Sequence, residues 1–205
     1  MWERAFTDAV TFFVVVNPIG EVVPIFIALT RGRPPLEQRQ IARRSVLIAT
    51  IILVGFLVGG QILLQALEIP LPSFQIASGI VLFLFGLKMI FHEEPHHDAP
   101  STGAKQDIAV FPLAMPTIAG PGAMLAAVVL TDNDRFNMVE QVETASVMLC
   151  ILLLTFVLLS LAGPIHRLLG DAGANVVSRV MGLILSALAV ETVVSGIEAL
   201  SSHLK

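Results

Sequence analysis

The residues best suited to chemistry stand in the middle of an apolar segment, at Asn17, Pro18, Gly20 and Glu21. The apolar run from about residue 5 to 29 is long enough to cross a bilayer as a helix. Pro18 removes a backbone donor and Gly20 frees the backbone, so we predict a broken helix with Asn17 as N-cap of its second half. Backbone groups freed at this depth must be satisfied by protein or by a water-filled cavity. The sequence therefore predicts a binding site here, and a proline kink without a site is the simpler alternative.

A second cluster of glycine and proline occupies residues 115–123, which read Met-Pro-Thr-Ile-Ala-Gly-Pro-Gly-Ala. Gly120 is the expected N-cap, and Pro121 is the expected first residue of the helix that follows. A helix start suits a carboxylate because its N–H groups are unpaired, whereas unwound carbonyl groups just before it suit an ammonium group. Two such breaks that face each other would hold both ends of a small zwitterion. Packing of helices on small residues is the alternative.

Two acidic residues, Glu21 and Glu191, lie within or beside apolar segments. Ionisable groups inside a membrane are energetically expensive and usually functional. Glu21 stands about one turn into its half-helix, where the helix dipole favours a negative charge. We interpret both acids as proton-coupling residues, and a structural carboxylate bonded within the bundle is the alternative for each. Lys88, near the end of its segment, is expected to extend its ammonium group to the membrane surface.

The pattern H-E-x-x-H, which holds zinc in metalloproteases, occurs at His92–His96. That chemistry needs both histidines one turn apart on a continuous helix, and Pro95 disfavours helix at the residue before it. We therefore expect a solvated linker at residues 92–107, with no metal, no cofactor and no catalytic residue. A membrane-embedded, metal-dependent enzyme that uses this segment is the competing hypothesis.

The composition is that of a helical protein that crosses the membrane several times. Of 205 residues, 55% are hydrophobic and only 14% are charged, against about 25% charged in soluble domains. Six apolar stretches are expected to span the membrane, at about residues 5–29, 45–66, 73–91, 108–130, 145–168 and 178–200. The net charge of −4 gives no reason to expect nucleic acid as a partner. The single cysteine, Cys150, excludes a disulfide within one chain.

The two halves of the chain correspond weakly at an offset of about 103 residues, which places Pro18 on Pro121. Because each half has three spans, the second half enters the membrane from the opposite side, as in the inverted repeats of secondary transporters. We predict an all-α fold in one membrane domain, 1–205, with repeats at 5–91 and 108–200 and with helices 1 and 4 broken. Lysine and arginine number 3 on the side of the termini and 9 on the other, so both termini are expected in the periplasm.

Three segments resemble the MarC family of bacterial inner-membrane proteins: Asn17-Pro-Ile-Gly20, Val23-Pro-Ile-Phe26 and Pro112-Leu-Ala-Met-Pro-Thr-Ile-Ala-Gly-Pro-Gly-Ala-Met124. The similarity extends over essentially the whole chain. It implies a multi-pass protein of the LysE-type transporter grouping, in which SnatA-type relatives move small neutral amino acids such as glycine and alanine with protons. It also implies a substrate site at the two breaks. The expected substrate-binding residues are Asn17, Pro18, Ile19, Gly20, Thr117, Ala119, Gly120, Pro121 and Gly122.

The sequence thus predicts a proton-coupled secondary transporter of small neutral amino acids in the bacterial inner membrane. Backbone groups at Gly20 and at residues 120–122 are expected to hold the carboxylate and the amine, and the side chains of Asn17 and Thr117 to orient the ligand. The expected partners are the amino acid, the coupling proton and the lipid bilayer, and a homo-oligomer is compatible with these features. A structural or regulatory membrane protein without a cavity is the other alternative.

Overall fold

A computed structural model describes residues 2–91, 107–133 and 136–203 of the chain. Within these ranges the structure contains helices and no strand, as predicted for an all-α protein. In chain order the elements are α1 (Trp2–Val16), η1 (Pro18–Val22), α2 (Val23–Thr30), α3 (Pro35–Ala66), α4 (Leu71–Phe91), η2 (Ala109–Ile118), α5 (Pro121–Val129), α6 (Met138–Ser160) and α7 (Ala162–His203). The elements η1 and η2 are π-helical, and the others are α-helical.

Five helical segments in the described part of the chain are long and apolar enough to cross a membrane. They are Trp2–Thr30, Pro35–Ala66, Leu71–Phe91, Met138–Ser160 and Ala172–Ser201. A sixth is obtained if η2 and α5, which are bent by 53° relative to each other, count as one span. These five or six segments confirm that the fold is that of a polytopic helical membrane protein.

The bounds predicted for the fifth span, residues 145–168, were wrong. Helix α6 begins at Met138 because Asn137 and Glu140 form a capping box in the polar segment before the apolar run. The amide of Glu140 donates to Oδ1 of Asn137 at 3.0 Å, and the amide of Asn137 donates to Oε2 of Glu140 at 2.8 Å. The helix ends at Ser160, and Leu161 leaves helical geometry before α7 begins.

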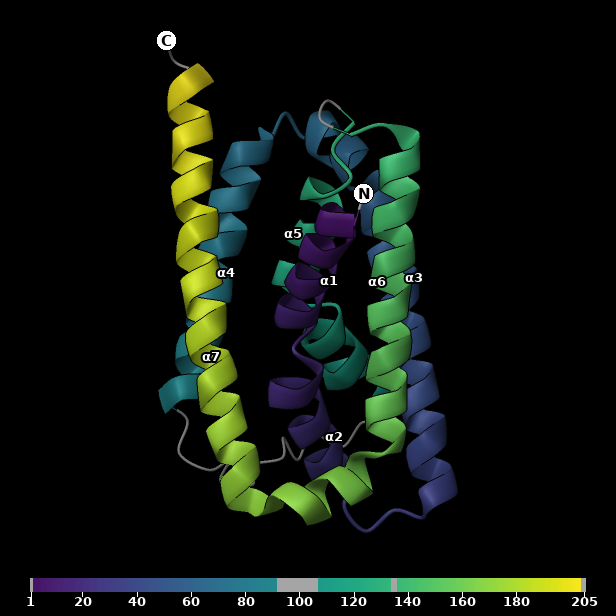
Figure 1. The fold of residues 1–205 in the computed structure, drawn as a ribbon. Helices are drawn as coiled ribbons and strands as arrows, with labels where there is room; N and C mark the ends of the chain where they lie inside the picture. Colours follow the sequence, from purple (N-terminus) through teal and green to yellow (C-terminus); the bar gives the residue numbers. More distant parts are fainter. Residues whose placement is uncertain (1, 92–106, 134–135, 204–205) are drawn as a thin grey trace.

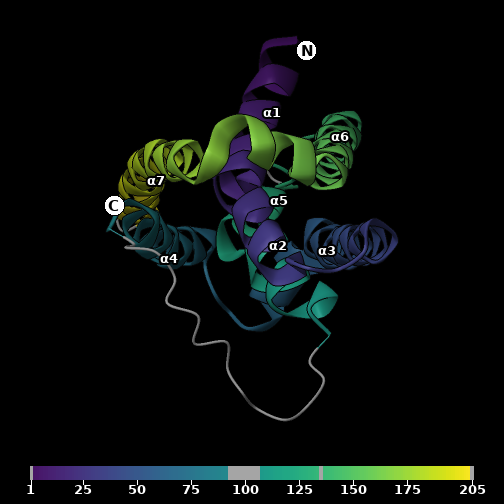
Figure 2. The same cartoon turned by 90° about the horizontal axis from the view of Figure 1, so that it is seen from below.

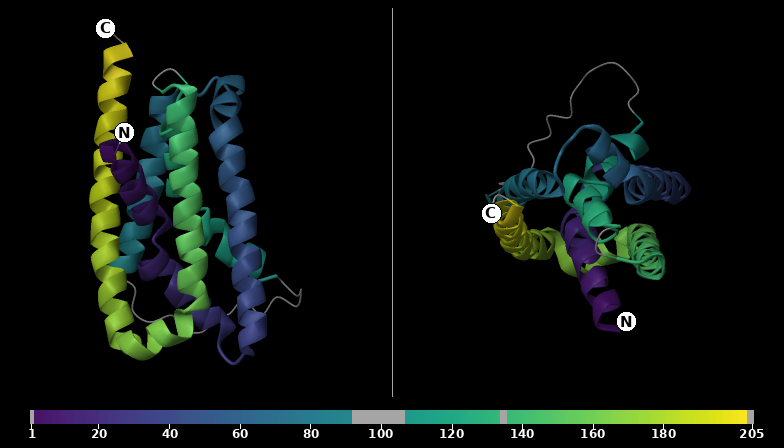
Figure 3. Two further views of the ribbon diagram at one scale, coloured as in Figure 1. Left: turned by 45° about the vertical axis from the view of Figure 1, so that its right-hand side comes forward. Right: turned by 90° about the horizontal axis from the view of Figure 1, so that it is seen from above.

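Helix α7 turns at Gly170, where φ is 64° and ψ is 177°. Only glycine adopts this conformation without strain. The segment before Gly170 crosses one end of the bundle, and the segment after it rises along α4 (Figure 1). Both termini lie at the other end, which we call the terminal end; the end where α3 begins is the opposite end (Figure 3).

The interrupted elements occupy the centre of the bundle. Seen along the helices, α1, α2 and α5 lie between the pair α4 and α7 on one side and α3 and α6 on the other (Figure 2). In α5 all residues from 122 to 128 are buried, as expected for a helix that is apolar on every side. Helices α4 and α7 approach closely through glycines, since a Cβ on Gly182 would lie 2.9 Å from the carbonyl oxygen of Gly86.

Candidate functional site

The first apolar helix is interrupted at Asn17, between α1 and η1. Asn17 has a left-handed conformation, with φ 49° and ψ 56°, which asparagine tolerates better than most residues. Pro18 disfavours the right-handed helical conformation at the residue before it and has no N–H of its own. The helix restarts at Pro18, and the carbonyl oxygen of Asn17 accepts hydrogen bonds from the amides of Glu21 at 3.1 Å and Val22 at 3.3 Å.

The side chain of Asn17 is buried at this interruption, with 2% of its surface exposed. Its Nδ2 donates to Sδ of Met89 on α4 at 3.3 Å, and a thioether is a weak acceptor. Its Oδ1 is buried and has no hydrogen-bond donor among the described residues. Buried polar atoms without a partner are rare in folded proteins. Oδ1 of Asn17 is therefore an acceptor that a ligand with an N–H group can satisfy.

Gly20 lies beside this oxygen atom and against α7. A Cβ atom on Gly20 would lie 2.6 Å from Oδ1 of Asn17 and 2.7 Å from Cβ of Met181, closer than Cβ atoms come in real structures. The carbonyl oxygen of Gly20 accepts a hydrogen bond from the hydroxyl group of Ser178 on α7. Only glycine therefore fits between the amide group of Asn17 and α7.

The second predicted break lies between η2 and α5. Inside η2 the backbone leaves helical geometry at Phe111 and Met115, and each of them precedes a proline, as the steric effect of proline on the preceding residue explains. Ala119, with φ −92° and ψ 65°, and Gly120, with φ −81° and ψ 170°, are non-helical. Helix α5 begins at Pro121, so Gly120 occupies the N-cap position that the sequence indicates.

Small residues are required at this second interruption because its surroundings are tightly packed. A Cβ atom on Gly120 would lie 2.7 Å from the carbonyl oxygen of Pro116, and one on Gly122 would overlap a methyl group of Leu82 on α4. Thr117 is buried, with 5% of its surface exposed. Substitution of either glycine by a larger residue would force the backbone or α4 to move.

The structure brings the elements that follow the first interruption and precede the second into contact, because η1 packs against η2. Four predicted site residues lie in η1 or directly before it: Asn17, Pro18, Ile19 and Gly20. The predicted residue Thr117 lies in η2, which contacts η1. Helices α6 and α7 also pack against η1. Two segments about 100 residues apart in the sequence therefore meet in one interior region.

The two acids predicted to couple protons occupy different places. Glu21 is half-buried in η1. Glu191 is exposed on α7, ten residues beyond Met181, a separation of about 15 Å along a helix. The structure places Glu21 next to Gly20 and does not bring Glu191 to the same region.

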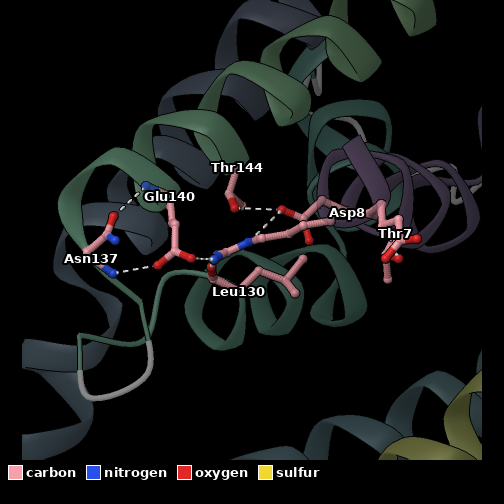
Figure 4. Close-up of polar contacts among 8 residues, drawn as sticks. Thr7, Asp8, Leu130, Asn137, Glu140 and Thr144 are labelled. Atoms are coloured by element: carbon pink, nitrogen blue, oxygen red, sulfur yellow. Dashed lines mark hydrogen bonds and ion pairs between the residues drawn. The ribbon is translucent and has the colours of Figure 1, made fainter. Parts of the chain in front are cut away.

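A polar cluster that the sequence analysis did not identify joins α1 to α6 at the terminal end (Figure 4). Asp8 is 2% exposed, and its Oδ2 accepts a hydrogen bond from the hydroxyl group of Thr144 at 2.6 Å. Arg4 lies 3.9 Å from the same oxygen atom and forms an ion pair of 3.0 Å with Glu140. The signal in the sequence is the pair Arg4 and Asp8, four residues apart at the start of an apolar run. We call these four residues the Asp8 cluster.

A cavity of about 560 Å³ lies at the opposite end of the bundle. It is lined by Arg33, Glu37, Gln40, Ile41, Arg44, Asp107 and Ile108. Arg44 on α3 forms an ion pair of 2.7 Å with Asp107, which lies just before η2. Arg33 forms an ion pair with Glu37, four residues later in the chain. The lining therefore carries both signs of charge beside the apolar side chains of Ile41 and Ile108.

The predicted zinc-like pattern, His92–His96, lies outside the described residues. In the ranges that the structure describes, no three side chains of His, Cys, Asp or Glu come together in a way that could hold a metal ion. The single cysteine, Cys150, is exposed on α6. Its position inside an apolar helix agrees with a lipid-facing side chain.

Known proteins resemble the chain over nearly its whole length. A family model described as "MarC family integral membrane protein" matches residues 2–201. The UPF0056 inner membrane protein YhgN of Escherichia coli is 34% identical over 194 residues, which cover 92% of this chain and 93% of that protein. A UPF0056 membrane protein of Methanocaldococcus jannaschii is 36% identical over 191 residues (91% and 92%), and YvbG of Bacillus subtilis is 32% identical over 197 residues (93% and 92%). No solved structure matches the chain.

Proposed function

The chain belongs to the MarC family of integral membrane proteins, and we propose that it is a proton-coupled secondary transporter of small neutral amino acids such as glycine and alanine. The observation that carries this proposal is the buried Oδ1 of Asn17, which has no donor among the described residues and lies beside Gly20. It is found inside a segment of 29 residues that is apolar enough to cross a membrane, where an unsatisfied polar atom is costly. We assign the ammonium group of the amino acid as the donor that satisfies this atom.

The carboxylate of the substrate is assigned to the start of α5. The N–H groups of Gly122 and Ala123 precede the first intrahelical bond of α5, which runs from the amide of Met124 to the carbonyl oxygen of Gly120 at 3.0 Å. Free N–H groups and the helix dipole both favour an anion at this end. The first turn of α5 contains no acidic residue. The glycines at both interruptions are closely packed, so we infer that the substrate enters when the helices move apart and that a bulky side chain is excluded.

Each half of the chain contributes one of the two interruptions. The segment from α1 to α2 runs from the terminal end to the opposite end, whereas η2 and α5 run the other way (Figure 1). Discontinuous helices that meet in antiparallel fashion are typical of secondary transporters built from inverted repeats. We therefore assign the chain two inverted three-helix repeats, 5–91 and 108–200, within one membrane domain, with helices 1 and 4 broken.

The two ends of the bundle differ in a way that suits alternating access. At the terminal end the Asp8 cluster holds α1 against α6, and Nε2 of Gln61 on α3 donates to Asp132 at 3.0 Å. At the opposite end lies the cavity of about 560 Å³. Residues 31–44, at this opposite end, contain five arginines, so the positive-inside rule assigns the cavity to the cytoplasm and both termini to the periplasm. The membrane is then the inner membrane.

Uptake of radiolabelled glycine and alanine into proteoliposomes, with a pH gradient imposed in either direction, tests the proposal. We expect uptake driven by one gradient, competed by unlabelled alanine and not by leucine. Asn17→Gly keeps the left-handed backbone accessible and removes Oδ1, so uptake should fall about tenfold or more, because a hydrogen bond to a charged group contributes about 1.5–3 kcal/mol. Asn133→Gly, at an exposed loop position, is the matched control. Folded protein that takes up neither amino acid under either gradient would overturn the proposal.

The proposal assigns no catalytic role to the chain. Metal analysis of the purified protein addresses the competing hypothesis of a metal-dependent enzyme at His92–His96. We expect no stoichiometric metal. Zinc bound at one equivalent and lost in His92→Ala would favour the enzyme over the transporter.

A further inference from the structure

The exposed face of α3 changes its chemistry along the helix. Between residues 39 and 44 the exposed residues are polar: Arg39, Gln40, Arg43 and Arg44. Further along, on the same face, the exposed residues are apolar: Leu47, Ile51, Val54, Val58 and Ile62. These positions recur every three or four residues and therefore share one face, whereas Ile41, Ala42, Ser45, Val46 and Ala49 point inward and are buried.

The polar part of this face belongs to a strongly basic segment. Residues 31–44 contain five arginines and one acid, Glu37. Among the described residues, Arg33 pairs with Glu37 and Arg44 pairs with Asp107, whereas Arg39 and Arg43 make no ion pair. Arg39 and Arg43 are one turn apart and both exposed. Two guanidinium groups at this spacing present forked donors that match the oxygen atoms of a phosphate group.

The charged and apolar parts of the face adjoin each other, as the headgroup and acyl chains of a lipid do. One helical turn, about 5.4 Å, separates Arg43 from Leu47, so the charges lie directly above the apolar part. The apolar part from Leu47 to Ile62, fifteen steps along the helix, covers about 22 Å of the axis, which is most of the hydrocarbon core of about 30 Å. With the charged part at the depth of the headgroups, the apolar part extends from there into the hydrocarbon core.

We propose that this face of α3 binds an anionic phospholipid. The lipid phosphate contacts the guanidinium groups of Arg39 and Arg43, and the acyl chains lie along Leu47 and Ile51. Basic clusters at a membrane surface favour anionic lipids by about 1 kcal/mol per arginine, or about fivefold in affinity. Two arginines therefore account for a preference of about 25-fold over a zwitterionic lipid with the same acyl chains. This inference does not depend on the transport function.

Native mass spectrometry of the purified full chain, with phosphatidylglycerol and phosphatidylcholine of identical acyl chains, tests the proposal. We expect phosphatidylglycerol to bind and to raise the melting temperature in detergent, with an effect that weakens as salt is added. The double variant Arg39→Gln/Arg43→Gln should lose about 25-fold in affinity for phosphatidylglycerol. The matched control is Arg167→Gln/Arg179→Gln, which changes the net charge equally at two exposed arginines of α7.

Three outcomes would overturn the lipid proposal. One is equal affinity for the two lipids, and another is unchanged affinity for phosphatidylglycerol in the Arg39→Gln/Arg43→Gln variant. The third is stabilisation by inorganic phosphate as large as that by phosphatidylglycerol, because the ligand would then be a free anion. Leu47→Asn tests the contact with the acyl chains separately, since it should weaken binding of phosphatidylglycerol without removing a charge.

Discussion

Replacement of Gly20 by alanine tests the packing on which the proposed substrate site depends. The added Cβ atom would lie 2.6 Å from Oδ1 of Asn17 and 2.7 and 2.8 Å from Cβ and Cγ of Met181. Ordinary van der Waals contact begins at 3.4 Å, so a shift of about 0.7 Å is needed on the side of Met181. Because Cβ of Met181 is fixed to the backbone of α7, η1 and α7 must move apart as units.

The cost of Gly20→Ala follows from this crowding. Overpacking a filled interior costs about 1–3 kcal/mol, and the better helix propensity of alanine recovers at most about 1 kcal/mol. We expect the free energy of unfolding to fall by about 1–2 kcal/mol, which corresponds to a melting temperature lower by about 2–8 °C for a chain of this size. Uptake should fall further, about tenfold, because the added methyl group stands against Oδ1 of Asn17, the atom assigned to the ammonium group of the substrate.

Thermal unfolding in detergent and uptake into proteoliposomes separate the two effects when suitable glycines serve as controls. Gly60→Ala would crowd the side chain of Val128, which lies near the end of α5 and not at its start, so it should lower stability and keep uptake. Gly59→Ala meets nothing within 4 Å and should leave both unchanged or raise stability slightly. A Gly20→Ala variant with the same melting temperature as the wild type would refute the packing argument. One that is destabilised but transports normally would refute the position assigned to the substrate.

Three further substitutions probe the interior. Thr144→Val removes the hydroxyl group that donates to the carboxylate of Asp8 and should lower the free energy of unfolding by about 1–3 kcal/mol. The control Ser146→Ala, on the exposed side of α6, should change the free energy of unfolding by less than about 0.5 kcal/mol. Equal effects of the two substitutions would contradict the buried hydrogen bond. Glu21→Gln keeps the shape of the side chain and removes its proton, so uptake should lose its response to a pH gradient while exchange of labelled for unlabelled alanine continues. If uptake still follows the gradient, Glu21 is not the coupling group. Gly182→Ala would place a Cβ atom 2.9 Å from a carbonyl oxygen of α4, and an unchanged melting temperature would contradict close packing of α4 on α7.

The membrane-spanning helices could be predicted because apolarity over about 20 residues is a strong local signal. Helix α4, expected at residues 73–91, is found at Leu71–Phe91. The start of the fifth span was predicted wrongly because it depends on hydrogen bonds between Asn137 and Glu140. A hydropathy pattern contains no information about these hydrogen bonds. A cap forms among polar residues, so the helix extends beyond the apolar run that reveals it.

The left-handed conformation of Asn17 has a local cause, because proline and asparagine act on the backbone beside them and this effect needs no neighbour in space. The roles of Asp8 and Glu191, unlike the conformation of Asn17, cannot be derived locally. Both are acids in an apolar segment, and the sequence around them does not distinguish a buried acid from an exposed one. Burial separates them: Asp8 is 2% exposed and bonded to Thr144, whereas Glu191 is exposed on α7. A membrane helix is apolar on almost every side, so its sequence shows little of the periodicity that marks the inward face of a soluble helix. The conformation of a residue is therefore readable from the sequence, but the partner of an acid follows from the packing of helices far apart in the chain.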